Sequence, residues 1–291
     1  MPLMQKAVTP AISAAILEDG HDRVSGFVLR AEDVSFATSV ELLHEAHGLG
    51  LPGSPFRADA PWVDVLRFPS SGQLRFEEAV GGPDEVSRVR AGGPHGQDVP
   101  QFWVMHTRVP AGSELVRVRA DGTSTPLARF ADVGHGWQPV GGEPALAPSL
   151  SRFVGLMARW RGAHLAADTL PDGGVVLASE SEPEPGLEGF TRTAAGRWRR
   201  EVPRAEVEEL FELVVMAAWG PLPVRVVDQW TDEDGEQVAR VSCVGHDADL
   251  AESLGLEEVD ADVYEANVRM GALQDVTPAR LVPDDWASAT A

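Results

Sequence analysis

The chain has very little of several residue types. Its 291 residues include one cysteine, Cys243, and one lysine, Lys6. A single cysteine excludes an intrachain disulfide framework and a zinc site built from several cysteines. No neighbouring motif marks Cys243 as a reactive nucleophile, so we expect it to be a buried structural thiol in a reducing cytoplasm.

The sequence also lacks long apolar runs. None approaches the roughly 20 residues that span a bilayer, so no membrane partner is predicted. The first 20 residues are mildly apolar but are interrupted by Pro10, and they lack the clean apolar stretch of a signal peptide. We expect residues 1–20 to form an N-terminal tail, either loose or with one short helix, on a cytoplasmic protein.

Catalytic and cofactor motifs are missing as well. The sequence contains no Gly-x-Ser-x-Gly elbow, no Walker loop and no dinucleotide fingerprint. Two histidines lie three residues apart on an expected helix, but the zincin motif needs a spacing of four and no third ligand is evident. We therefore predict no metal and no cofactor. The alternative is an enzyme or small-ligand protein whose site in the N-terminal domain gathers His44, His47, His106 and His135.

Negative charge is present in excess and lies mainly in the second half of the chain. The formal net charge is −21. Residues 180–291 hold 25 acidic residues against 9 arginines, whereas residues 1–179 hold 20 acidic and 15 basic residues. The electrostatic field of this negative charge repels nucleic acid and anionic lipid, and it raises the rate at which the chain meets a basic protein. The alternative is that the negative charge only keeps the protein soluble.

Turn signals and hydrophobic periodicity divide the first half of the chain. Residues 21–140 are predicted to form an α+β domain, and residues 141–150 a linker. Within the domain we expect a helix at 35–47, ended by Gly48, and a flexible loop at 81–98. The expected strands are 24–29, 62–68, 72–76, 102–107, 114–119 and 127–130.

A tandem repeat follows the linker. Met157–Trp160 recurs as Met216–Trp219, and Trp198–Val202 recurs as Tyr264–Val268. The two predicted β-rich units are residues 151–215 and 216–291. About 60 residues with four or five short strands are typical of a small barrel. The predicted fold class is therefore α+β and β-rich: an N-terminal α+β domain followed by two tandem small SH3-like β-barrel units.

Local patterns in the second unit predict individual elements. Residues 238–244 alternate, so that Ala239, Val241 and Cys243 share the core face of a strand. Residues 246–254 are expected to form a helix that begins at an aspartate cap and ends before a glycine.

Several short segments of residues 156–286 resemble one family of proteins. They are Trp160-Arg-Gly, Gly189-Phe190, Gly196-Arg-Trp198, Val202-Pro-Arg-x-Glu-Val207, Leu210-Phe-Glu-Leu213, Val244-Gly-His-Asp-Ala-Asp-Leu-Ala, Leu254-Gly-Leu-Glu, Val263-Tyr-Glu and Val268. The family is that of actinobacterial immunity proteins, which accompany secreted toxins of the tuberculosis-necrotizing-toxin type that hydrolyse NAD. The resemblance implies that the chain binds such a toxin in the producing cell and blocks its active site.

The acidic turn of the second unit is the predicted partner-binding site. Residues 228–265 hold 13 acidic residues and a single arginine, Arg240. Carboxylates suit the arginines and lysines of a basic toxin, and a tryptophan beside them is typical of an interface hot spot where its ring is exposed, which the sequence does not decide. The predicted contact residues are Trp230, Asp232, Glu233, Asp234 and Glu236. The alternatives are protection of a sheet edge by charge and a scaffold module that binds peptides in a tryptophan-lined groove.

Overall fold

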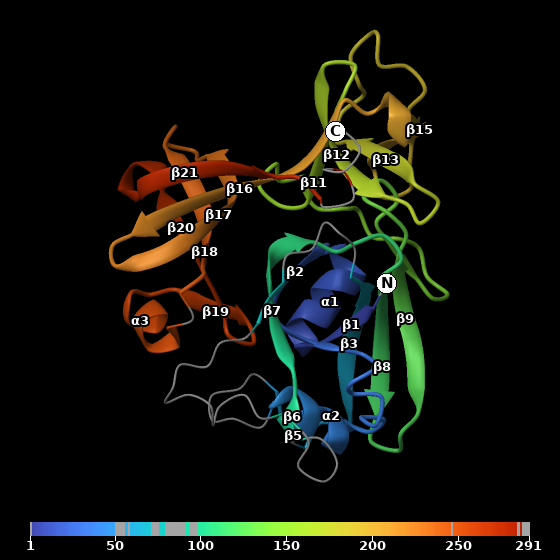
Figure 1. The fold of residues 1–291 in the computed structure, drawn as a ribbon, viewed down its shortest axis with the longest axis vertical. Helices are drawn as coiled ribbons and strands as arrows, with labels where there is room; N and C mark the ends of the chain where they lie inside the picture. Colours follow the sequence, from blue (N-terminus) through green and yellow to red (C-terminus); the bar gives the residue numbers. More distant parts are fainter. Residues whose placement is uncertain are drawn as a thin grey trace.

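The computed structural model describes residues 2–49, 56, 57, 59–70, 76–78, 91, 92, 98–245, 247–283 and 286. It is 49% strand and 12% helix, arranged as two large antiparallel sheets (Figure 1). Within these ranges, no helix is both long enough and apolar enough to cross a membrane. Most of the expected strand at 72–76 and of the expected loop at 81–98 lies outside the described residues.

The first sheet has eight strands in the order β10-β9-β8-β3-β1-β2-β7-β4. Its strands are β1 (Leu3–Val8), β2 (Arg23–Arg30), β3 (Trp62–Pro69), β4 (Phe76–Glu78), β7 (Gln101–Arg108), β8 (Glu114–Arg119), β9 (Ser124–Phe130) and β10 (Trp137–Pro139). The strands expected at 24–29, 62–68, 102–107, 114–119 and 127–130 are thereby confirmed. Two short strands, β5 (Ala91–Gly92) and β6 (Asp98–Val99), pair with each other.

The N-terminal residues form the centre of this sheet instead of a tail. β1 lies between β3 and β2 and pairs with both. Thr9 then caps helix α1 (Pro10–Glu18), because its Oγ1 accepts a hydrogen bond from Ile12 N at 3.2 Å. The short helix expected within residues 1–20 is therefore present, but the prediction of a tail is wrong, since β1 is buried from Met4 to Val8. The sequence did not reveal this strand because a strand buried on both faces shows no alternation.

Helix α2 (Val40–His47) begins five residues later than predicted and ends where predicted. Ser39 is its N-cap, with Oγ accepting a hydrogen bond from Leu42 N at 3.4 Å. Gly48 ends it in the left-handed conformation, at φ +63°. Residues 31–36 form turns and not a helix. The apolar side chains Phe36 and Ala37 still pack on the core of the first sheet, but from an irregular segment.

The second sheet has eleven strands and contains no closed barrel. Its order is β14-β15-β13-β12-β11-β16-β17-β18-β20-β19, and β21 pairs with β16 outside this order. The strands are β11 (Leu156–Trp160), β12 (Ala163–Thr169), β13 (Gly174–Ser179), β14 (Thr191–Arg192), β15 (Trp198–Pro203), β16 (Glu209–Trp219), β17 (Leu222–Thr231), β18 (Gln237–Cys243), β19 (Glu257–Asp260), β20 (Val263–Arg269) and β21 (Gln274–Leu281).

One long strand explains why the prediction of two tandem SH3-like barrels is wrong. β16 pairs with β11 through Glu209–Glu212 and with β17 through Val215–Trp219. The predicted boundary between residues 215 and 216 therefore falls inside a strand. In Figure 1, β16 runs from the yellow-green strands β11–β13 to the orange and red strands β17–β21. The fold is thus β-rich with two antiparallel sheets, and not an α+β domain followed by barrels.

The two parts of the second sheet show the same succession of elements. β15 leads into a 3-10 turn, Arg204–Glu206, before β16, and β20 leads into the turn Met270–Ala272 before β21. The helix predicted near 246–254 is present as α3 (Ala248–Ser253), where Asp247 Oδ1 accepts a hydrogen bond from Leu250 N at 2.9 Å. Residue 246 itself lies outside the described residues.

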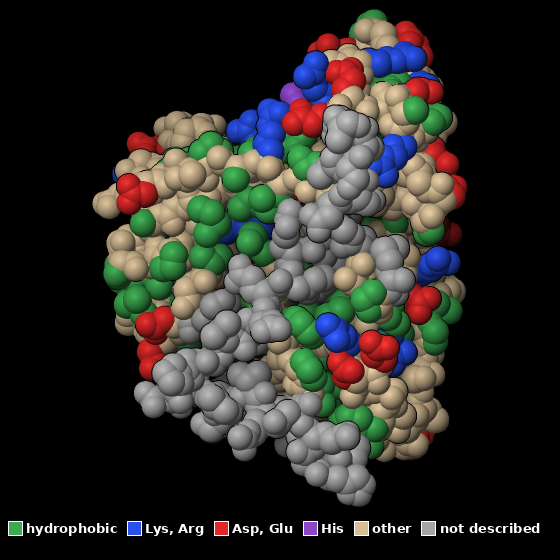
Figure 2. Space-filling model, in the orientation of Figure 1, with side chains coloured by type: hydrophobic (Ala, Val, Ile, Leu, Met, Phe, Trp, Pro, Cys, Tyr) green, Lys and Arg blue, Asp and Glu red, His purple; other side chains and the backbone are tan. Residues whose placement is uncertain are grey.

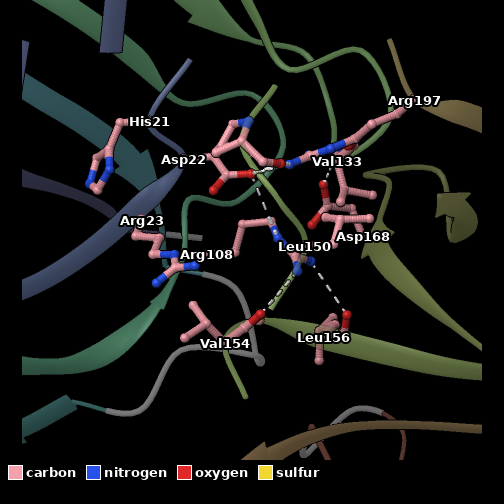
Figure 3. A network of polar contacts seen from close by, with 12 residues as sticks. His21, Asp22, Arg23, Arg108, Val133, Leu150, Val154, Leu156, Asp168 and Arg197 are labelled. Carbon is pink, nitrogen blue, oxygen red and sulfur yellow. Dashed lines mark hydrogen bonds and ion pairs between the residues drawn. The ribbon is translucent and has the colours of Figure 1, made fainter. Parts of the chain in front are cut away.

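Buried charges join the two sheets (Figure 3). Arg197, just before β15, donates to Asp22 Oδ2 at 3.2 Å and to the carbonyl oxygen of Val133 at 2.7 Å. Arg108, at the end of β7, donates to the carbonyl oxygen of Val154 at 2.9 Å, and its Nε lies 3.9 Å from the same Asp22 oxygen. The Asp22 carboxylate therefore lies between two guanidinium groups. Each guanidinium group also donates to backbone carbonyl groups, either of the other sheet or of the segment that joins the two sheets.

The Arg108 side chain has room because residue 155 is glycine. A Cβ atom at Gly155 would lie 2.6 Å from the Cβ of Arg108, and Gly155 has a φ of +80°. We expect Gly155→Ala to lower the free energy of unfolding by about 2–5 kcal/mol, the sum of left-handed strain and overpacking. Urea denaturation monitored by tryptophan fluorescence measures this loss.

Gly173→Ala is the matched control. Gly173 has a φ of +88°, and a Cβ atom there would meet no atom within 4 Å. This variant therefore carries the backbone strain without the clash, and we expect it to lose only about 1–2 kcal/mol. Equal losses in the two variants would contradict a steric role for the contact with Arg108.

Candidate ligand site between the two sheets

A cavity of about 340 Å³ lies where the two sheets face each other. The first sheet contributes residues of β1, β2 and β7, and the second sheet contributes residues of β17–β20. Eight titratable side chains line it: Lys6, His21, Arg23, His106, Asp228, Arg240, Asp260 and Glu265. Apolar side chains complete the walls. A concave site with a few converging polar groups at a boundary between structural units is the usual form of a small-molecule site.

Ion pairs cross this boundary on both sides of the cavity. Lys6 Nζ of β1 lies 3.1 Å from Asp260 Oδ2 of β19, and the lysine side chain is only 3% exposed. Arg23 of β2 donates to Asp228 Oδ2 of β17 at 3.0 Å. Lys6 and Arg23, the two cations that the first sheet brings to the cavity, therefore each meet a carboxylate of the second sheet.

His106 lines the cavity and is almost fully buried. Its side chain is 8% exposed, and its Nδ1 lies 3.3 Å from Glu265 Oε1. Neither ring nitrogen has a hydrogen-bond partner in the described part of the chain. Burial, with smaller contributions from Arg23 and Arg225, lowers the pKa of His106 well below its usual value. The imidazole is therefore neutral at physiological pH.

The carboxylate beside His106 is held by the second sheet. Glu265 Oε2 accepts a hydrogen bond from Arg240 Nε, on the neighbouring strand β18. Burial raises the pKa of Glu265, and Arg240 opposes that rise. His21 also lines the cavity, and burial lowers the pKa of its imidazole. Figure 3 shows the His21 ring directed away from the Asp22 carboxylate. His21 therefore lines the cavity, whereas Asp22 belongs to the buried network that joins the two sheets.

The structure brings only one of the four predicted histidines to this cavity. His106 lines it, whereas His47 lies 3.1 Å from Gln5 Nε2. Burial and then Lys6 lower the pKa of His47 to about 3. His44 shares α2 with His47, and His135 lies on a separate turn with its Nδ1 3.0 Å from Asp132 Oδ2. Among the described residues, no group of three or more potential ligands is placed to hold a metal ion.

The predicted acidic turn joins β17 to β18 at the surface. Trp230 is 39% exposed and pairs with Val238 across the hairpin. Asp232 Oδ1 accepts hydrogen bonds from the backbone N–H groups of residues 234 and 236, so this carboxylate shapes the turn. Glu236 lies 3.7 Å from Arg269 Nε. Glu233 and Asp234 are exposed at the tip. On the face shown in Figure 2, acidic and basic side chains are interspersed.

Most residues of the cavity have no recognisable signal in the sequence. The run His21-Asp22-Arg23 places three titratable groups at the start of a strand, and Lys6 is the only lysine and lies in an apolar segment. These two features are unusual enough to have marked the positions as buried and paired. Nothing local marks Asp228 or Glu265, because their partners lie about 200 and 160 residues away in the sequence.

Another buried carboxylate, that of Asp168, lies in the network of Figure 3. Asp168 of β12 accepts a hydrogen bond from the backbone N–H of Val133 at 2.5 Å. Burial raises its pKa to about 7, although Arg108 opposes the rise. The folded state therefore binds a proton between about pH 4 and pH 7 that the unfolded chain has released, and this contribution to stability is lost as the pH rises through that window.

We expect Asp168→Asn to remove this pH dependence, because asparagine can still accept the bond from Val133 but does not titrate. The free energy of unfolding of the wild type should fall, relative to that of the variant, by up to about 1.4 kcal/mol per pH unit between pH 4 and 7. Urea denaturation at pH 5 and pH 8 measures the difference. Asp172→Asn, on the exposed turn after β12, should keep the wild-type dependence. Parallel curves for the wild type and Asp168→Asn would refute the assignment.

Comparisons of the chain with protein-family models, with curated proteins and with solved structures found no match.

Proposed function

We propose that this chain is an immunity-type binding protein, and not an enzyme, which holds a basic protein partner on the β17–β18 hairpin. The observation that carries the proposal is the exposure of Trp230 beside exposed carboxylates on a paired hairpin. Tryptophan is enriched among the residues that dominate binding energy at protein interfaces. A hairpin whose turn is shaped by its own aspartate presents that ring with little loss of conformational entropy on binding.

Electrostatics favours a basic partner. The chain carries a net charge of −21, and the tip of the hairpin adds Glu233 and Asp234 with exposed side chains. Such a field raises the association rate of a basic protein and disfavours nucleic acid and anionic membranes. Charged groups at the rim of an interface act mainly on this rate, whereas a buried aromatic side chain acts mainly on dissociation.

The resemblance of residues 156–286 to actinobacterial immunity proteins supports a toxin as the partner. On this proposal the chain remains in the cytoplasm of the producing cell and covers the active site of a secreted NAD glycohydrolase. No cofactor is needed for such an inhibitor. The toxin to test is the one encoded beside the gene of this chain.

The double substitution Glu233→Lys with Asp234→Lys tests the electrostatic part of the proposal. We expect the association rate constant with the purified toxin to fall roughly 10-fold at low ionic strength, and its dependence on salt to weaken. Trp230→Ala should instead raise the dissociation rate constant roughly 30-fold, which corresponds to about 2 kcal/mol. Surface plasmon resonance measures both constants, and toxin-catalysed NAD hydrolysis reports inhibition.

The pair Glu182→Lys with Glu184→Lys is the matched control, because it makes the same change of charge on an exposed loop between β13 and β14. An equal loss of association rate in this control would assign the effect to net charge instead of the hairpin. The absence of any complex between the wild-type chain and the toxin would end the proposal.

A further inference from the structure

We infer that a second cavity, beside Arg67, binds a small monocarboxylate whose two oxygens accept hydrogen bonds from the Arg67 guanidinium group. This cavity has a volume of about 320 Å³ and lies between residues 31–38 and the strands β1, β3 and β8. It is distinct from the cavity between the sheets, and the inference does not depend on the proposed function. Three observations carry it: an arginine without a carboxylate, a fixed orientation of its side chain, and unused donors that a ligand can reach.

Arg67 lacks the ion pair that buried cations of this chain commonly form. Its side chain is half-buried in β3, and it forms no ion pair with a carboxylate of the described residues. Seven other buried or half-buried cations each pair with a carboxylate: Lys6, Arg23, Arg108, Arg117, Arg197, Arg199 and Arg225. A charged side chain withdrawn from water is normally paired. Arg67 therefore offers a place for a carboxylate that the chain itself does not supply.

Two neighbours fix the orientation of the Arg67 side chain. Arg67 Nε donates to Gln5 Oε1 at 3.0 Å, and Gln5, directly opposite on β1, is 3% exposed. Because a guanidinium group can only donate, the glutamine turns its oxygen to Arg67 and its NH₂ group to His47, whose Nε2 lies 3.1 Å from Gln5 Nε2. This series of hydrogen bonds occupies Nε and leaves the two Nη groups of Arg67 for another partner.

The Nη groups can be reached from the cavity. Neither has a hydrogen-bond partner among the described residues, and neither is a buried atom. Arg67 lines the cavity together with the hydroxyl-bearing residues Ser35, Thr38 and Ser124. The apolar part of the wall consists of Leu3, Val34, Ala37 and Val118. A ligand with one charged group and a short apolar body matches this lining.

Electrostatics favours a single negative charge on the ligand. A carboxylate matches the planar fork of a guanidinium group and can accept two parallel hydrogen bonds from it. A phosphate monoester carries a charge of about −1.5 to −2 at pH 7, whereas Arg67 supplies one positive charge. The excess negative charge would be repelled by a chain whose net charge is −21.

Glu114 is the carboxylate of the chain that competes with such a ligand. It is exposed and lies opposite Arg67 in the register of β3 and β8, so both side chains point to the same face of the sheet. Its negative charge repels a second carboxylate at Arg67. We expect Glu114→Gln to tighten binding about 2–5-fold, the ordinary effect of one exposed charge.

Benzoate, benzamide and phenyl phosphate are the probes, because they share one apolar body and differ in the group that meets Arg67. Titration of the wild-type chain labelled with ¹⁵N-arginine follows the Nε–H resonance of Arg67, which is assigned by its absence from the spectrum of Arg67→Met. We expect benzoate to shift this resonance with saturation. Benzamide and phenyl phosphate should bind at least about 10-fold more weakly.

Three results of this titration would overturn the inference. The first is the absence of a saturable shift with benzoate. The second is binding of benzamide as tight as that of benzoate, which would make the cavity an apolar site without a role for the charge. The third is binding of phenyl phosphate as tight as that of benzoate, which would assign Arg67 to phosphate. The three probes are compared on the wild-type chain, so the comparison does not depend on the stability of a variant.

Variants then locate the carboxylate. Arg67→Met should weaken benzoate binding at least about 10-fold, and Arg67→Lys, which keeps the charge without the fork, should recover only part of the affinity. Arg192→Met, at an exposed arginine of β14, makes the same change of net charge and should bind as the wild type does. Saturation-transfer NMR of benzoate measures these affinities. Unchanged binding by Arg67→Met, or an equal loss in Arg192→Met, would refute the role of Arg67.

Discussion

A buried carboxylate, that of Asp22, lies between the guanidinium groups of Arg108 and Arg197 and connects the two sheets. Asp22 precedes β2, Arg108 ends β7, and Arg197 precedes β15. Both arginines also donate to backbone carbonyl groups, which fixes the directions of their guanidinium groups. Loss of one member of such a network leaves an uncompensated buried charge and typically costs about 3–5 kcal/mol. The orientation of one sheet on the other depends on this arrangement.

The polar character of the boundary explains the cavity. Apolar faces interdigitate until little space remains, whereas paired charges fix distances and directions between the side chains they join. Lys6 with Asp260 and Arg23 with Asp228 hold β1 and β2 against β19 and β17. The strands around this space cannot move closer without breaking these pairs, and the space is the cavity of about 340 Å³.

The hairpin and the cavity lie close together on β17. The β17–β18 hairpin carries an exposed aromatic ring and exposed carboxylates. Asp228 lines the wall of the cavity, and Trp230 follows two residues later on the same strand. Residues two apart in a strand point to the same face, so a substitution at Trp230 lies beside the wall of the cavity.

The amino-acid sequence by itself determined the local elements. Alternation at 238–244 predicts the core face of Ala239, Val241 and Cys243, and all three are buried in β18. An aspartate cap predicts α3, and Gly48 predicts the end of α2. These features arise from side chains and backbone groups within a few residues of one another, so a short window of sequence contains the physical cause.

Only the tertiary structure decided how the elements join and where the cavity lies. The N-terminal residues become the central strand of a sheet because β2 and β3 pair with them, and β16 merges two predicted barrels because it pairs with β11, β17 and β21. Of the four candidate histidines, only His106 meets the cavity, where Glu265 arrives from a strand far along the chain. Pairing between distant strands and burial of distant charges depend on the whole chain, and no local pattern records them.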